Sequence, residues 1–120
     1  IDHFRNQKKK VGLLNIRMFR PFPAKEVSEI LSTAKKIVVI DRNISFGSTG
    51  IFFQEITSAL YQHSKNKPLA FNVIAGLGGS DITPELIEEI INETFSLNEA
   101  TKPIWKGVYH DAVKPAFRER

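Results

Sequence analysis

Residues 37–40 (IVVI) form an uninterrupted run of four β-branched apolar residues, and this run largely decides which folds the chain can adopt. β-branched residues favour extended strands, and a run without a polar position is typical of a strand covered on both faces. Such strands occur in parallel sheets that are packed between helices. The run is also far shorter than the ~20 apolar residues needed to cross a bilayer, so we infer no membrane span and no membrane partner.

Amphipathic segments alternate with short apolar segments around this run. Apolar residues recur at helical spacing over 24–34 and over 51–63, and residues 69–75 read as another buried strand. Residues 11–18 have the pattern of a strand, and the first six residues have helical spacing. The predicted order is therefore helix, strand, helix, strand, helix, strand, helix.

The last helix of this order has the clearest start signal. Thr83 is placed to cap it, Pro84 occupies the first helical position, and Glu85 faces the positive end of the helix dipole. Ile82 and Ile87 are spaced as a hydrophobic staple around that cap. The sequence therefore predicts a helix that begins at residue 84 and extends to about residue 95.

This alternation predicts a three-layer α/β fold with a mainly parallel sheet and helices on both faces. The 120 residues suit one domain. We expect this domain to occupy residues 1–96 and to be N-terminally truncated, with its first strand and most of its first helix missing. Residues 97–120 show no clear period, and we expect them to form a tail that packs on the domain or on a partner.

The charge distribution and the absence of cysteine limit which partners and which cellular compartment we expect for the chain. The chain has 17 Lys and Arg against 13 Asp and Glu, but much of the excess lies at its two ends. No basic helix face with interleaved aromatic residues is visible, so we predict no nucleic-acid partner. The absence of cysteine excludes disulfides, thiolate metal sites and iron–sulfur ligation by this chain, and it favours a cytoplasmic location.

Three polar or glycine-bearing segments follow the predicted strands, namely residues 20–23, 41–47 and 76–81. Functional sites of open parallel sheets lie beyond the carboxyl ends of the strands, so we expect these segments to converge. We expect Asp41 to cap a turn on an exposed edge and Arg42 to pair with a carboxylate in this chain or in a partner. The candidate interface residues are Asp41, Arg42, Asn43, Ser45, Phe46, Gly47, Gly76, Gly78, Gly79 and Asp81.

An anion site at the start of the helix over 51–63 is an alternative interpretation. The stretch from Ser45 to Gly50 leads into this helix, whose free N–H groups could receive a phosphate or a carboxylate. The chain has neither a G-x-G-x-x-G nor a G-K-[ST] motif. Glycines in turns more often allow backbone torsions with positive φ than bind a ligand. A stand-alone flavodoxin-like module that binds an anionic ligand here therefore stays open at this point.

Catalytic motifs are scarce. His3, His63 and His110 have no ligand spacing, and no G-x-S-x-G elbow occurs. The paired glutamates lie on the outer face of the last helix, where a solvated surface is the ordinary interpretation. We therefore assign no catalytic residue, no cofactor-binding residue and no metal ligand.

Three ordered stretches carry a family resemblance: VGLLNIRMFRPFP, IVVIDRNISFG and IAGLGGSDITPELI. Together they resemble the C-terminal part of the α subunit of pyruvate:ferredoxin oxidoreductase, a transketolase C-terminal-like domain. The later stretch IWKGV resembles the end of that subunit. The loop DRNISFG is similar to the pyruvate-type branch of the 2-oxoacid:acceptor oxidoreductases.

The resemblance implies a role in the oxidative decarboxylation of pyruvate to acetyl-CoA with reduction of ferredoxin or flavodoxin. It also implies thiamine diphosphate, iron–sulfur clusters and coenzyme A in the parent complex, held by other domains or subunits. We therefore expect this chain to be a structural and interface domain that is inactive alone. The candidate residues at the carboxyl edge would then face those other domains or subunits.

Overall fold

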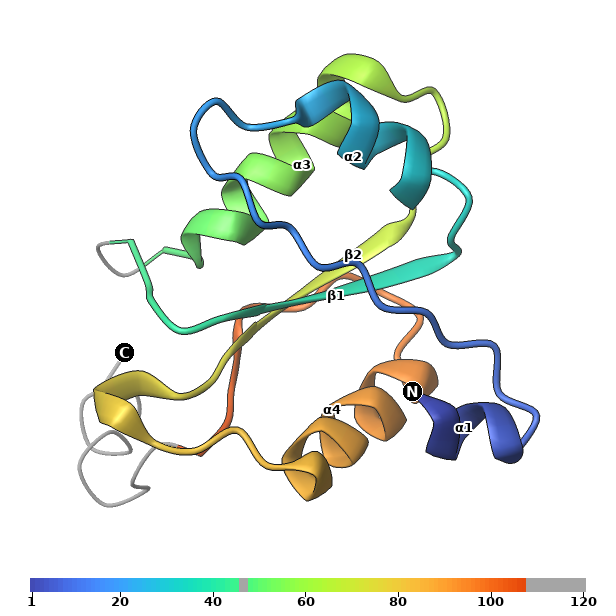
Figure 1. Cartoon of the computed structure of the whole chain (residues 1–120), viewed down its shortest axis with the longest axis vertical. Helices are drawn as coiled ribbons and strands as arrows, with labels where there is room; N and C mark the ends of the chain where they lie inside the picture. The colour runs from blue at the N-terminus through green and yellow to red at the C-terminus, as the bar shows by residue number, and fades with distance from the viewer. Residues whose placement is uncertain (46–47, 108–120) are drawn as a thin grey trace.

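The β-branched run lies in β1 (Lys36–Asp41), the outer strand of a three-stranded parallel sheet with the order β1-β2-β3. The structure is a computed structural model that describes residues 1–45 and 48–107 (Figure 1). β2 (Leu69–Ile74) is the middle strand and β3 (Ile104–Trp105) is the short strand beside it. The helices are α1 (Asp2–Asn6), α2 (Ala24–Leu31), α3 (Ile51–His63) and α4 (Pro84–Ser96), with a short 3₁₀ turn η1 (Leu77–Gly79).

Helices cover both faces of the sheet, as the all-apolar strand pattern predicts. α2 and α3 lie on one side, and α1 and α4 lie on the other (Figure 1). Ile37 and Val39 join the core cluster under α2 and α3, whereas Val38 and Ile40 pack against a second cluster around Ile90 of α4. The three-layer α/β fold with a mainly parallel sheet is therefore confirmed.

The register of the sheet brings the carboxyl ends of its strands together. β1 and β2 pair from Lys36 opposite Leu69 to Asp41 opposite Ile74, so both strands end at the same level. The segments that follow Asp41 and Ile74 consequently leave the sheet side by side. This common edge is where Asp41, Arg42 and Gly76 lie.

The prediction of a strand over 11–18 is wrong. The segment is extended, but among the described residues no backbone hydrogen bond joins it to a strand. Its alternating pattern reflects Leu14 and Ile16, which pack against the core cluster without ladder pairing. The third strand is instead β3, in a region without a clear sequence period, and Lys106 N donates to Ile74 O at 2.9 Å.

The start of α4 follows the predicted signals. Thr83 is its N-cap, and its hydroxyl accepts a hydrogen bond from Leu86 N at 3.1 Å. Pro84 is the first helical residue. In the part of the chain that the structure describes, no helix is long and apolar enough to cross a membrane.

Lys106 links the end of β3 to α4 through two ion pairs. Its Nζ lies 2.6 Å from Glu89 Oε1 and 2.6 Å from Glu93 Oε2, and these hydrogen bonds raise the pKa of Lys106 above 10.5. We expect Lys106→Met to lower the free energy of unfolding by roughly 0.5 to 1 kcal/mol at pH 7. Because the pKa is raised by folding, this contribution is fully present below pH 10.5 and is lost as the pH rises through the raised value. Urea unfolding of both proteins at several pH values measures it, and equal stabilities at pH 7 would contradict it.

Candidate functional site at the carboxyl edge of the sheet

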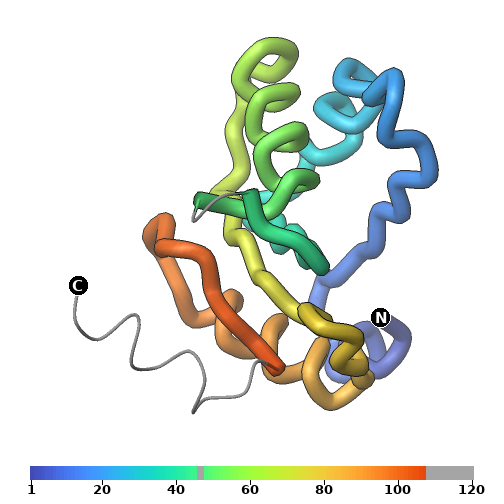
Figure 2. The backbone as a smooth tube through the Cα atoms, turned by 90° about the vertical axis from the view of Figure 1, so that its left-hand side faces the viewer, coloured from blue at the N-terminus to red at the C-terminus, as the bar shows by residue number. Residues whose placement is uncertain are grey.

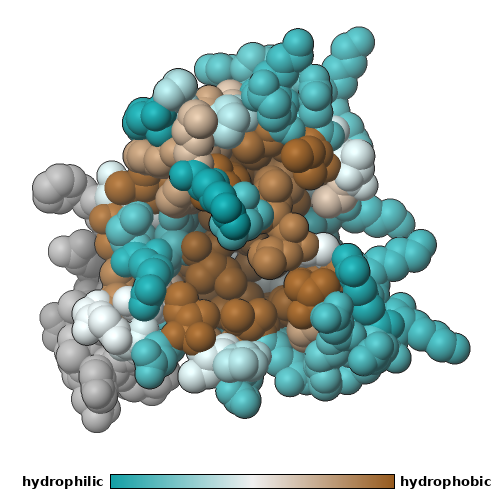
Figure 3. Space-filling model, viewed as in Figure 1, coloured by the Kyte–Doolittle hydropathy of each residue, from teal (hydrophilic) through white to brown (hydrophobic). Residues whose placement is uncertain are grey.

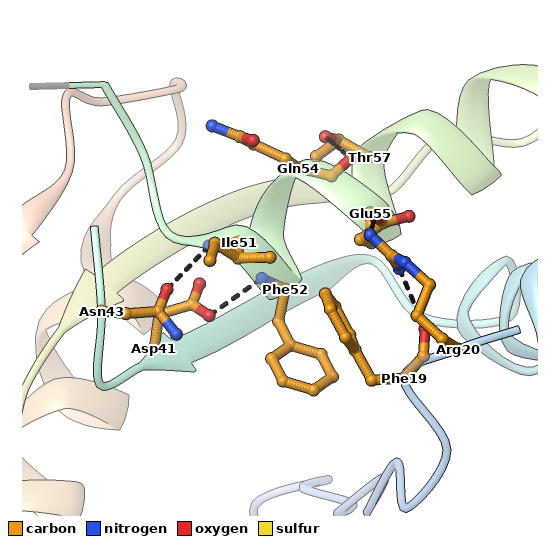
Figure 4. A network of polar contacts seen from close by, with 9 residues as sticks. All are labelled: Phe19, Arg20, Asp41, Asn43, Ile51, Phe52, Gln54, Glu55 and Thr57. Carbon is orange, nitrogen blue, oxygen red and sulfur yellow. Dashed lines mark hydrogen bonds and ion pairs between the residues drawn. The ribbon is translucent and has the colours of Figure 1, made fainter. Parts of the chain in front are cut away.

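Asp41 binds the start of α3 from the end of β1 (Figure 4). Its Oδ1 accepts from Phe52 N at 3.0 Å, and its Oδ2 accepts from Phe53 N at 3.1 Å. Asn72 of β2 donates from Nδ2 to the same Oδ2 at 3.0 Å. Only 1% of Asp41 is exposed, so the expectation that it lies on an exposed edge is wrong. The carboxylate caps α3 across the fold because the sheet register brings the two ends together.

Two asparagines complete this capping. Asn72 Oδ1 accepts from Gly50 N at 2.8 Å, and Asn43 Oδ1 accepts from Ile51 N at 3.1 Å. With the two amides bound by Asp41, all four N–H groups at the start of α3 have side-chain acceptors within the chain. The prediction that these N–H groups are free for an anion is therefore wrong. The flavodoxin-like alternative loses its ligand site, because the anion bound at this position is the chain's own carboxylate.

Burial and hydrogen bonding change the pKa of Asp41 in opposite directions. Burial raises the pKa of Asp41 above its usual value, while the hydrogen bonds from Phe52, Phe53 and Asn72 lower it. The positive end of the α3 dipole faces the same carboxylate. The three donors therefore compensate for part of the cost of holding a charge inside the protein.

Gly50 has no side chain, and the Asp41 carboxylate occupies the space that a side chain would need. Its φ is −66°, a value open to any residue, so its conformation does not require glycine. A Cβ built on Gly50, however, would overlap with Oδ2, Cγ and Cβ of Asp41. Glycine is needed at this position because the Asp41 side chain packs directly against its backbone.

Arg42 connects the loops that follow β1 and β2. Its side chain is exposed, and its Nη2 donates to Ser80 O at 3.4 Å. Gly76 has a φ of +72°, and a Cβ on it would lie 2.7 Å from Arg42 Nε. Among the described residues no carboxylate lies within ion-pair distance of Arg42. Pairing with a carboxylate of a partner stays a prediction.

The remaining candidates lie around this contact. Ser45 is half-buried and its N–H donates to Thr49 O at 2.9 Å. Gly78 and Gly79 are exposed with φ values of +67° and +82°, which confirms the interpretation that these glycines serve the turn. Asp81 is exposed as well. Phe46 and Gly47 lie outside the described residues.

The segment at residues 20–23 reaches the same region through α3. The Phe19 ring lies 5.1 Å from the Phe52 ring, and Arg20 forms an ion pair with Glu55 at 2.7 Å (Figure 4). Phe52 thus contacts Asp41 through its backbone and Phe19 through its ring. The loops after β1 and β2 therefore meet through Arg42 and Ser80, and the segment at residues 20–23 contacts α3 through Arg20 and Glu55.

Most of the chain, including this edge of the sheet, matches a known protein family. The family described as pyruvate:ferredoxin oxidoreductase core domain II matches residues 1–87, which is most of the chain. The chain belongs to this family. The match includes all of β1, β2 and α3 and the buried Asp41 network.

Individual relatives are subunits of 2-oxoacid oxidoreductases. The chain is 44% identical over 102 residues to the ketoisovalerate oxidoreductase subunit VorA of Pyrococcus furiosus, which covers 85% of this chain and 26% of that subunit. It is 43% identical over 112 residues to the pyruvate synthase subunit PorA of Methanothermobacter thermautotrophicus, with 93% and 27% covered. PorA of Thermotoga maritima is 39% identical over 98 residues, with 82% and 25% covered. This core domain II chain thus spans about a quarter of each relative.

Among the residues that the structure describes, no group of side chains in this core domain II chain fits the cofactors that the family resemblance implies. The sequence has no cysteine for an iron–sulfur cluster, and among the described residues no three His, Asp or Glu side chains gather as metal ligands. The backbone amides that would suit a diphosphate at α3 are bound by Asp41, Asn43 and Asn72. His3 lies at the surface, 3.2 Å from Glu88.

Sequence reasoning missed Asn72 and Gly50, on which the network depends. Asn72 is the single polar residue in β2 (LAFNVI), and a lone amide in a buried strand must find hydrogen-bond partners. That exception to the apolar pattern is the signal that could have found it. Gly50 carries no comparable signal, because its requirement comes from a side chain nine residues earlier in the sequence.

Proposed function

We propose that this chain is a domain of the α subunit of a 2-oxoacid:ferredoxin oxidoreductase that converts pyruvate to acetyl-CoA. The observation that supports this most strongly is the match of residues 1–87 to core domain II of the family. The relatives named as pyruvate synthase subunits support pyruvate as the substrate, as does the DRNISFG loop. The parent complex would act in the cytoplasm and pass its electrons to ferredoxin.

The domain would contribute structure and contacts while other domains or subunits hold thiamine diphosphate, coenzyme A and the iron–sulfur clusters. Two features support this division of roles. The polar groups at the carboxyl edge, Asp41 and Asn72 above all, are engaged with α3 and with each other. The neighbouring Arg42, Gly78 and Asp81 are exposed on the same edge, where a partner surface can reach them.

Turnover assays of the full parent complex test the activity. We expect reduction of ferredoxin that requires both pyruvate and coenzyme A, with kcat/KM for pyruvate about tenfold or more above that for 3-methyl-2-oxobutanoate. Omission of coenzyme A is the control. A complex that oxidises neither 2-oxoacid would contradict the proposed function, and a preference for the branched substrate would contradict the pyruvate assignment alone.

A further inference from the structure

Four basic side chains surround a hollow in the surface just after α1. The hollow has a volume of about 530 Å³, and it is lined by Arg5, Lys8, Lys9, Lys10, Val11 and Gly12. We call the four cations, residues 5, 8, 9 and 10, the α1 basic cluster. Figure 3 shows hydrophilic side chains over the region where Figure 1 places α1.

The turn that ends α1 gives this cluster a defined shape. Lys8 lies in the left-handed region with a φ of +60°, which few residues other than glycine adopt. Its N–H donates to Arg5 O at 2.9 Å, and Lys9 N donates to Phe4 O at 3.0 Å. Arg5 Nε then donates to Val11 O at 3.3 Å, which holds the chain after the turn beside α1. The fold therefore gathers these cations around one hollow.

Lys9 joins the cluster to the last turns of α4. Its Nζ donates to Asn92 Oδ1 at 2.9 Å and lies 5.7 Å from the centre of the Phe95 ring. Lys36, at the start of β1, donates from Nζ to Phe95 O at 2.7 Å. α1 lies against α4 in both backbone views (Figures 1 and 2). The cluster thus lies at the amino edge of the sheet, at the opposite end from Asp41 and Arg42.

The charge of the cluster is not compensated within the described part of the chain. Among residues 1–45 and 48–107, no carboxylate lies within ion-pair distance of any of its four cations. Lys9 has a neutral hydrogen-bond partner, and Arg5, Lys8 and Lys10 are exposed. Like charges at this spacing repel one another, and a bound anion relieves that repulsion. The surface is therefore complementary to negative charge.

The groups that carry this charge favour an acidic protein surface over a single phosphate group. Compact phosphate sites use backbone N–H groups at helix N-termini or in nests. Here the N–H groups of Lys8 and Lys9 donate within the turn, and the hollow lies at the C-terminal end of α1. Lysine presents its charge on a long, flexible stem, so three lysines can each reach a separate carboxylate.

We propose that the α1 basic cluster docks a carboxylate-rich surface of another subunit of the parent complex. The relatives of this chain are named as subunits, and the inference rests on the proposed function to the extent that it assumes such an assembly. Complementary charge at this surface would orient the two subunits and speed their association. It adds a contact at the amino edge to the one expected at Arg42.

Zero-length carbodiimide cross-linking of the parent complex identifies the neighbouring carboxylates, because it joins an amine only to a carboxylate in direct contact. We expect Lys8 or Lys10 to be linked to an Asp or Glu of another subunit. Lys65, which is exposed just after α3, is the control and should form no such link. The absence of links at Lys8 and Lys10 would overturn the proposal. Links only within the same polypeptide, or only to added ferredoxin, would also overturn it.

Lys8→Glu combined with Lys10→Glu tests whether charge attraction holds this contact. In about 0.1 M salt we expect the dissociation constant of the linked subunit to rise about tenfold or more. In about 0.5 M salt the difference should fall below about twofold, because salt screens exposed charges. Lys25→Glu combined with Lys65→Glu is the matched double reversal at exposed positions, and it should change binding by less than about twofold at either salt concentration.

Equal binding by the two double variants would overturn this inference alone and leave the proposed function intact. A loss of binding that persists in high salt would show damage to packing rather than lost attraction, and it would overturn the inference too. A wild-type chain that binds no other subunit would contradict both the inference and the proposed function. None of these measurements depends on turnover.

Discussion

Gly50→Ala is expected to destabilise the chain by about 3 to 5 kcal/mol, the largest effect of any single methyl group at this edge. The new Cβ would occupy the position of the Asp41 carboxylate. Either the carboxylate leaves the amides of Phe52 and Phe53, or the start of α3 moves away from β1. Both responses leave buried polar groups without partners, which adds to the steric cost. Urea unfolding followed by circular dichroism measures the change.

Gly12→Ala is the matched control for this substitution. A Cβ on Gly12 would meet no atom within 4 Å, and the residue is exposed. We expect its effect to stay within about 0.5 kcal/mol, as for other surface substitutions. If Gly50→Ala proved as mild as Gly12→Ala, the packing of Asp41 against Gly50 would be wrong.

Asp41→Ala is expected to lower the free energy of unfolding by about 2 to 4 kcal/mol. The substitution removes the acceptor of two α3 amides and of the Asn72 side chain. Asp41 is almost fully buried, so little water can replace the lost hydrogen bonds. The same unfolding experiment measures this loss, and the exchange rates of the Phe52 and Phe53 amides should rise with it.

Asp41→Asn separates the hydrogen bonds from the charge. The asparagine keeps one oxygen for an α3 amide, but its NH₂ group faces donors such as Asn72 Nδ2. A buried charge is costly, which is why burial raises the pKa of Asp41, and removing the charge offsets part of the loss. We expect a smaller loss than for Asp41→Ala, about 1 to 2 kcal/mol. A larger loss for Asp41→Asn than for Asp41→Ala would contradict the capping role.

The sequence predicted most of the secondary structure, because local patterns decided it. The run IVVI, the amphipathic period of α3 and the Thr83 cap each act over a few residues, and each element formed where expected. Residues 11–18 show the limit of this reasoning. Their alternation was real, since Leu14 and Ile16 pack on the core, but a strand also requires a pairing partner that the segment itself cannot supply.

Sequence reasoning brought the residues after β1 and β2 to one edge of the sheet, but its expectation of an exposed Asp41 was wrong. The rule that functional edges follow parallel strands placed Asp41, Arg42 and Gly76 together. The rule could not show that Asp41 turns inward, because that depends on Asn72 and Gly50, which are distant in sequence and adjacent only after folding. A charged residue after a buried strand can therefore belong to the interior when a helix start supplies donors.

Assembly and turnover of the parent complex carrying Arg42→Glu test most directly whether this domain acts as an interface rather than a catalytic unit. Arg42 is exposed at the carboxyl edge. Lys25→Glu makes the same charge reversal at an exposed position of α2 and is the matched control. We expect Arg42→Glu to reduce the fraction of assembled complex about tenfold or more, Lys25→Glu to leave it unchanged, and the rate per assembled complex to stay within twofold for both. Full assembly with a rate per complex lowered by about 100-fold or more in Arg42→Glu alone would place catalysis at this edge and contradict the account.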